Sequence, residues 1–200
     1  AEQFSIIQNR GCVGGGNLCA IQLHQGRRVT SRSADSIVAE AERMTHEPDF
    51  KGYIHDIGGP TANFRFPSCR EQMLRGMCNG GKHCLAPQTC SHMIVDHSDY
   101  LKILRRVREL PGVKKVFIRS GIRFDYLMAD PDDTFFKELV EYHVSGQLKV
   151  APEHCAPNTL AYMGKPPIET FNKFKDKFYE LSKKAGKKQY LVPYLMSSHP

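Results

Sequence analysis

The 200-residue sequence has no apolar run approaching the roughly 18 residues that a membrane-spanning helix needs. It also lacks a basic segment followed by an apolar one at its start, so nothing in it indicates secretion. Internal repeats and low-complexity tracts are missing as well. Together with a hydrophobic content of 40%, these absences predict one globular domain over residues 1–200, in the cytoplasm and without a membrane partner.

A disulfide framework is not expected, because seven cysteines is an odd number and no export signal accompanies them. The cysteines gather in two groups, Cys12 with Cys19 and a second set between residues 69 and 90. Reduced cysteines in clusters favour metal or iron–sulfur ligation. The chain starts at Ala1 almost within a strand and ends at Pro200 just after an apolar run, so we interpret it as a piece of a longer protein.

The net charge of +7 permits an anionic partner such as nucleic acid. Many of the lysines lie between Lys165 and Lys188, where one solvated helix face would explain them equally well. The aromatic residues of that segment fall at core spacing and do not resemble a base-stacking platform.

Apolar periodicity predicts an α/β fold in which strands and helices alternate. The expected strands are residues 4–7, 53–57, 116–118, 148–151 and 190–195, the last with a bulge or kink at Pro193. The expected helices begin at Ser33, at Ser98, at Asp130 with Pro131 as the first helical residue, and before Phe171. Such a pattern builds a parallel sheet, open or curled into a partial barrel, with chemistry at the carboxyl ends of the strands.

The loop after the first strand reads Cys12-Val13-Gly14-Gly15-Gly16-Asn17-Leu18-Cys19. With a cysteine in place of Gly16 its spacing would be C-x3-C-x2-C, which resembles the cluster loop of radical SAM enzymes. The glycines permit the backbone turns, including positive φ, that a cluster loop requires. A phosphate-binding loop, or an ordinary turn with two incidental thiols, is the alternative, although no GxGxxG pattern or P-loop lysine is present.

The second group is spaced C-x8-C-x5-C-x5-C within an irregular insertion over residues 60–97, and comprises Cys69, Cys78, Cys84 and Cys90. Four thiolates suit either tetrahedral zinc or a second iron–sulfur cluster, with His83 and His92 as substitute ligands. The insertion looks poor in core residues, which favours a metal staple. Idle or buried thiols remain the alternative.

Polar or backbone-exposing residues follow the later strands. Gly58 and Gly59 suit recognition of an amino-acid-like ligand, or form a plain tight turn. Arg123 and Asp125 could contact a ligand carboxylate and amine, or pair with each other. Glu153 and His154 are candidates for acid/base or ribose contacts, or are structural.

With these residues in view, the chain resembles the YgiQ family of radical SAM proteins. The resemblance runs from end to end. The segments that carry it include Arg10-Gly11-Cys12, His24-Gln25-Gly26-Arg27, Gly58-Gly59-Pro60-Thr61-Ala62-Asn63, Ser120-Gly121-Ile122-Arg123-Phe124-Asp125 and Leu148-Lys149-Val150-Ala151-Pro152-Glu153-His154.

The resemblance implies a partial (β/α) barrel that binds a four-iron–four-sulfur cluster and S-adenosylmethionine, with an external electron donor and an unknown substrate. Cluster-driven cleavage of the sulfonium would give methionine and a deoxyadenosyl radical. Cys12 and Cys19 match the outer cluster ligands, and Gly16 occupies the place of the middle ligand. The residues matched to S-adenosylmethionine are Gly58, Gly59, Ser120, Arg123 and Glu153, while Pro60 stands where many relatives carry an acid.

Gly16 is the departure from the pattern, because no Asp, His or Cys within the loop replaces the thiolate and His24 is the nearest candidate. We therefore expect a radical SAM core whose cluster site is impaired. The rival hypothesis is a non-enzymatic binding module, held by metal at Cys69 to Cys90, that contacts nucleic acid through its lysine-rich helix.

Overall fold

The computed structural model describes residues 3–14, 19–75, 84–153, 157–163 and 165–195. Its helices are α1 (Ile21–Gln25), α2 (Ala34–Thr45), α3 (Arg70–Arg75), α4 (Ser98–Arg108), α5 (Phe124–Met128), α6 (Thr134–Glu138), α7 (Pro157–Met163) and α8 (Ile168–Lys184), with a π-helical turn η1 (Leu139–His143) after α6. Its strands are β1 (Ser5–Ile7), β2 (Asn9–Arg10), β3 (Thr30–Ser31), β4 (Tyr53–Ile54), β5 (Asp56–Gly58), β6 (Lys115–Val116), β7 (Gln147–Glu153) and β8 (Tyr190–Leu195).

The predicted α/β class is confirmed, with strands in short parallel pairs. β1 pairs with β5, β4 with β6 and β7 with β8, while β2 and β3 form an antiparallel pair. Further backbone bonds, from His55 N to the Phe4 oxygen at 3.0 Å and from Phe117 N to the Ile54 oxygen at 2.9 Å, set β1 and β6 on opposite sides of β4–β5. The strands in the described residues do not close into a barrel.

The second predicted strand, residues 53–57, is split into β4 and β5. Ile54 and Ile57 are both fully buried in the same core, although they are three positions apart. Strict alternation would put them on opposite faces, so the ladder gives way at His55 and both side chains turn inward. A second irregularity lies in β7: one extra residue separates the Val150–Pro193 and Glu153–Leu195 pairs, which agrees with the bulge expected near Pro193.

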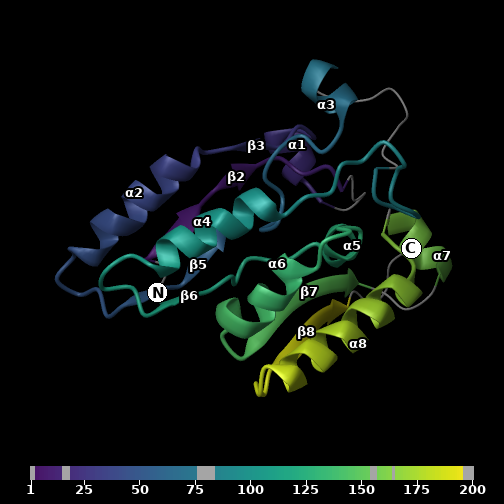
Figure 1. Ribbon diagram of the computed structural model, residues 1–200. Helices are drawn as coiled ribbons and strands as arrows, with labels where there is room; N and C mark the ends of the chain where they lie inside the picture. Colours follow the sequence, from purple (N-terminus) through teal and green to yellow (C-terminus); the bar gives the residue numbers. More distant parts are fainter. Residues whose placement is uncertain (1–2, 15–18, 76–83, 154–156, 164, 196–200) are drawn as a thin grey trace.

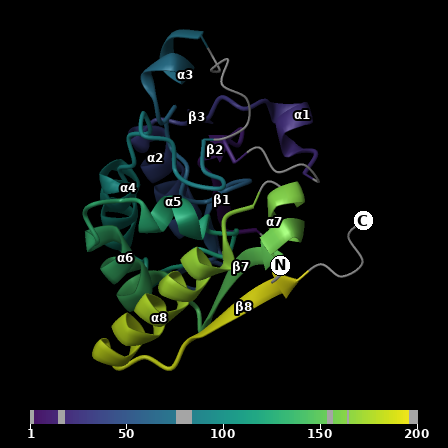
Figure 2. The ribbon, with the colours of Figure 1, turned by 90° about the vertical axis from the view of Figure 1, so that its right-hand side faces the viewer.

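One hydrophobic core joins most of the chain. It contains Ile6 of β1, Leu104 of α4, Phe136 of α6 and Phe174 of α8, each at most 2% exposed. In Figures 1 and 2, helices α2, α4, α6 and α8 lie on the same side of the strands. The helices therefore cover one face of the strands, and the core fills the space between them.

The start of the third predicted helix differs from expectation. The helix begins at Thr134 rather than at Pro131, and Asp130 does not cap it. Asp130 instead accepts hydrogen bonds from His97, while Asp132 Oδ1 accepts the Thr134 N–H at 3.0 Å and the Thr134 hydroxyl at 2.6 Å. Asp130 is thus bonded to His97 and not to the helix, which begins about one turn later than expected.

Candidate functional site

A cavity of about 280 Å³ lies where the carboxyl ends of β1, β5, β6 and β7 meet. Six segments line it: the first loop, the start of α1, the turn after β5, the segment after β6, β7, and the connection between α7 and α8. The lining residues are Cys12, Cys19, Ile21, Pro60, Thr61, Gly121, Ile122, Arg123, Phe124, Lys149, Val150, Lys165 and Pro166. Cys12 and Cys19 of the first loop and Arg123 of the segment after β6, all singled out from the sequence, thus lie at one cavity.

The first loop contacts the segments that follow β5 and β6. Cys12 Sγ lies 3.7 Å from the Thr61 hydroxyl. A Cβ on Gly14 would sit 2.7 Å from Arg123 Nη1 and 3.4 Å from Cys12 Sγ, so glycine lets the guanidinium lie against the loop. Positive φ occurs at Gly11 (+86°) rather than at Gly14. Gly16, which stands at the place of the expected middle cluster ligand, falls outside the described residues.

Gly58 and Gly59 pack closely against the side chains of Ser120 and Asn9. A Cβ on Gly58 would meet Ser120 Oγ at 1.7 Å, and one on Gly59 would meet Asn9 Oδ1 at the same distance. Ser120 Oγ accepts the Gly59 N–H at 3.3 Å and donates to Asp56 Oδ1 at 3.0 Å. The absence of side chains at this turn is therefore required by the groups packed against it, which sequence alone did not reveal.

Arg123 and Asp125 pair with each other. Arg123 Nε donates to Asp125 Oδ1 at 2.6 Å and Nη2 donates to Oδ2 at 3.0 Å, and the carboxylate is only 4% exposed. Of the two interpretations of this motif, an intramolecular ion pair is the one confirmed. The pair fixes the guanidinium at the cavity wall in a bidentate arrangement.

A buried amide clamps the backbone of Arg123. Asn63 Oδ1 accepts the Arg123 N–H at 2.8 Å, and Nδ2 donates to the Arg123 oxygen at 3.1 Å. Asn63 Nδ2 also lies 3.1 Å from His97 Nε2. Because an amide NH₂ only donates, His97 Nε2 accepts, and the imidazole proton sits on Nδ1.

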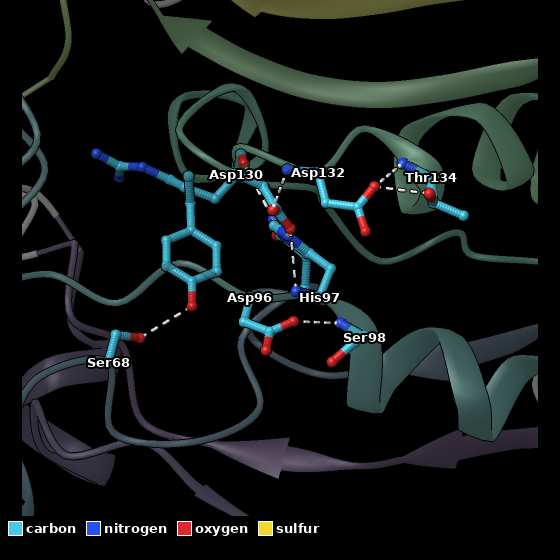
Figure 3. Close-up of polar contacts among 10 residues, drawn as sticks. Ser68, Asp96, His97, Ser98, Asp130, Asp132 and Thr134 are labelled. Carbon is cyan, nitrogen blue, oxygen red and sulfur yellow. Dashed lines mark hydrogen bonds and ion pairs between the residues drawn. The ribbon is translucent and has the colours of Figure 1, made fainter.

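That proton has a partner in Asp130, whose Oδ2 lies 2.7 Å from His97 Nδ1 (Figure 3). The imidazole is buried and stacks on Phe135 at 4.7 Å between ring centroids. Asp130, His97 and Asn63 thus form a chain of hydrogen bonds that ends on the backbone of Arg123. Sequence reasoning missed this chain, since its members lie 33 or more residues apart and belong to no motif.

The Cys-rich insertion contributes a second, smaller core. Phe64 and Leu85 are buried there with Val13 of the first loop, so the expectation of an insertion poor in core residues is wrong for its described part. Cys69 Sγ accepts the Gln72 N–H at 3.4 Å, and Cys84 Sγ lies 3.5 Å from Arg27 Nη2.

No group of three metal-ligating side chains occurs among the residues that the structure describes. Cys90 Sγ lies 3.7 Å from His92 Nδ1, whereas Cys78 and His83 fall outside the described residues. The second metal site therefore remains a prediction.

Two further candidates are only partly placed. The backbone of Glu153 pairs with Leu195 at the end of β7, and His154 lies outside the described residues. His24 is exposed on α1. The lysines of α8 are mostly exposed, and the phenylalanines of that helix are buried, as predicted.

The fold and the rim define a mixed α/β protein with a small cavity, walled by two thiols and three cationic side chains, at the carboxyl ends of its strands. In sequence, the chain is 64% identical over 198 residues to a UPF0313 protein of Clostridium perfringens (strain ATCC 13124). It is 57% identical over 198 residues to a UPF0313 protein of Clostridium botulinum (strain Okra).

Both alignments cover 99% of this chain but only 30% and 31% of the relatives. The chain is thus homologous to one segment of UPF0313 proteins, and YgiQ is the family so named, which confirms the resemblance at that level. No protein-family model matches the chain. Within its described part, no helix is long and apolar enough to cross a membrane.

Proposed function

We propose that the chain is the core of a radical SAM-type enzyme, a partial (β/α) barrel whose rim binds S-adenosylmethionine beside an incomplete iron–sulfur site. The observation that carries the proposal is the convergence of Cys12, Thr61 and Arg123 on one cavity from three separate strand ends. In parallel α/β sheets, ligands bind at this end of the strands. That the longer protein uses a substrate and an external electron donor is part of the same proposal.

The thiols present do not suffice for a complete cluster site. Cys12 and Cys19 line the cavity, but the third ligand position is Gly16. A four-iron cluster held in this way needs a thiolate on each of three irons, so the donor set is one short.

The resemblance assigns Gly58, Gly59 and Ser120 to S-adenosylmethionine, beside the cavity rather than in its wall. The Gly59 N–H donates to Ser120 Oγ at 3.3 Å, and the Gly58 oxygen accepts the Gln8 N–H at 2.7 Å. Lys149 and Arg123 line the cavity as cations that suit a carboxylate. Glu153 lies at the end of β7, and the resemblance assigns it to the same cofactor.

The test is anaerobic reconstitution with iron and sulfide of the native chain and of Gly16→Cys. Loss of one outer-shell partner of a metal ligand typically costs about 10–100-fold, so a missing thiolate should cost at least as much. We expect Gly16→Cys to gain iron, cluster absorption in the visible range, and cleavage of S-adenosylmethionine that the native chain lacks.

A Cys19→Ser change in the Gly16→Cys background supplies the control. Cys19 is exposed, so its replacement should not disturb folding. The iron lost on this change belongs to the first loop, and any iron that remains belongs to the second cysteine group. Equal cluster content and equal cleavage in the native chain and in Gly16→Cys would contradict the impairment.

A further inference from the structure

One face of the strands carries aromatic and cationic side chains and, in the part of the chain that the structure describes, is not covered by α2, α4, α6 or α8. Along β6 and the residues after it, Val116 and Ile118 are buried in the core. Lys115, Phe117 and Arg119 alternate with them and so point to the opposite face. In Figure 2 the helices α2, α4, α6 and α8 gather on the other side of the strands. We call the uncovered side the open face.

Two aromatic rings lie side by side on the open face. Tyr53 of β4 pairs in register with Lys115, and its ring is parallel to that of Phe117, with centroids 6.4 Å apart and 2° between the planes. The Arg119 guanidinium carbon lies 5.5 Å from the centroid of Phe117. Tyr53 is 39% exposed, so the aromatic pair is open to a ligand.

The open face carries two cations and one carboxylate. Within the described residues, neither Lys115 nor Arg119 forms an ion pair with a carboxylate. The carboxylate is that of Asp56 on the neighbouring β5, whose Oδ1 accepts the backbone N–H groups of Arg119 and Ser120 at 2.8 and 3.1 Å. Lys149, exposed between buried Leu148 and Val150, extends the positive charge to the cavity that it lines.

We propose that the open face binds single-stranded nucleic acid. Parallel aromatic rings offer a surface on which unpaired bases stack, and cations placed along a strand neutralise phosphates. The net charge of +7 complements such a polyanion. Because Lys149 belongs both to this face and to the cavity, a bound strand would bring a nucleotide to the cavity edge. The inference does not depend on a cluster, and it differs from binding through the lysines of α8.

The test measures the affinity of the 200-residue chain for a fluorescein-labelled 12-mer of uridine by anisotropy, at about 50 mM and 200 mM salt. We expect Tyr53→Leu to weaken binding by about fivefold or more, with an unchanged salt dependence, because it removes stacking but no charge. Arg119→Gln should instead lower the slope of log K against log salt by about 0.7, the value for one phosphate contact on a single strand.

The matched control is the double change Lys183→Gln and Lys184→Gln, which removes two exposed charges from α8. Affinity close to that of the unchanged protein is expected, and thermal melting of each variant verifies its fold. Three results would overturn the proposal: no binding of the 12-mer at low salt, a Tyr53→Leu variant of native affinity, or a loss in the α8 control as large as that in Arg119→Gln. The last would move the site to α8.

Discussion

At the scale of single residues, the rim is built around positions that cannot carry a side chain. Gly58 faces Ser120 and Gly59 faces Asn9, with each oxygen 1.7 Å from where a Cβ would be. Neither glycine has a positive φ, so backbone conformation does not explain them. The requirement arises from close approach between β5 and its neighbours.

Gly58→Ala should therefore destabilise the protein by about 1–3 kcal/mol, the usual cost of forcing an extra carbon into a packed site. Urea denaturation measures the change. Gly121→Ala is the matched control, because a Cβ there meets nothing within 4 Å and its φ is not positive. If both variants lose the same stability, the contact with Ser120 is not what requires glycine.

At the scale of elements, the segment before α6 divides its acids between two tasks. Asp132 accepts the N–H and the hydroxyl of Thr134, two residues on, in a local turn just before the helix, and these bonds lower the pKa of the Asp132 carboxyl. Asp130 anchors His97 instead, and so links the start of α4 to the start of α6. Asp132 thus acts within its own turn, whereas Asp130 joins two helices that are distant in sequence.

Alanine substitutions separate these tasks. Asp132→Ala should cost little stability, because its carboxylate is exposed and its hydrogen bonds stay within one local turn. Asp130→Ala should cost about 2–3 kcal/mol, because it leaves the buried Nδ1–H of His97 without its acceptor. Chemical denaturation ranks the two, and an equal or reversed order would show that His97 gains little from Asp130.

At the scale of the whole molecule, a buried histidine joins the π-helical turn η1 to the strands. His143 of η1 donates Nδ1–H to the Val116 oxygen at 2.8 Å, and Arg108 of α4 donates to Nε2 at 3.3 Å. Burial lowers the pKa of His143 from 6.5 to about 4, with a smaller contribution from the nearby Arg108 charge. The folded protein therefore holds this ring neutral.

Because the folded pKa of His143 is depressed, the unfolded chain binds the extra proton first as the pH falls below about 6.5. The contribution of His143 is complete above that pH and is lost toward pH 4. Between pH 6.5 and 5 the free energy of unfolding should fall by about 1–2 kcal/mol. Denaturation curves across this range measure it.

The control for this prediction is His46→Asn, since His46 is exposed and should leave the pH dependence unchanged. His143→Asn should flatten the dependence while lowering stability at neutral pH. A native slope in His143→Asn would contradict the assignment.

Local sequence patterns determined the alternation of strands and helices, because apolar spacing and turn residues act over a few positions. The glycine pair, the clustered cysteines and the polar strand ends were visible for the same reason. The division of residues 53–57 was not, since it depends on two isoleucines that meet one core. Nor could spacing show which partner Asp130 or Arg123 would take.

Patterns within the sequence thus predict the α/β class and show the cysteine loop with its glycine at position 16. Only the tertiary structure decided that Arg123 pairs with Asp125, that Asn63 and His97 hold its backbone, and that Tyr53 and Phe117 share an uncovered face. Apart from Arg123 and Asp125, which are two positions apart, these contacts join residues distant in sequence, and packing of the strands against the helices brings them together.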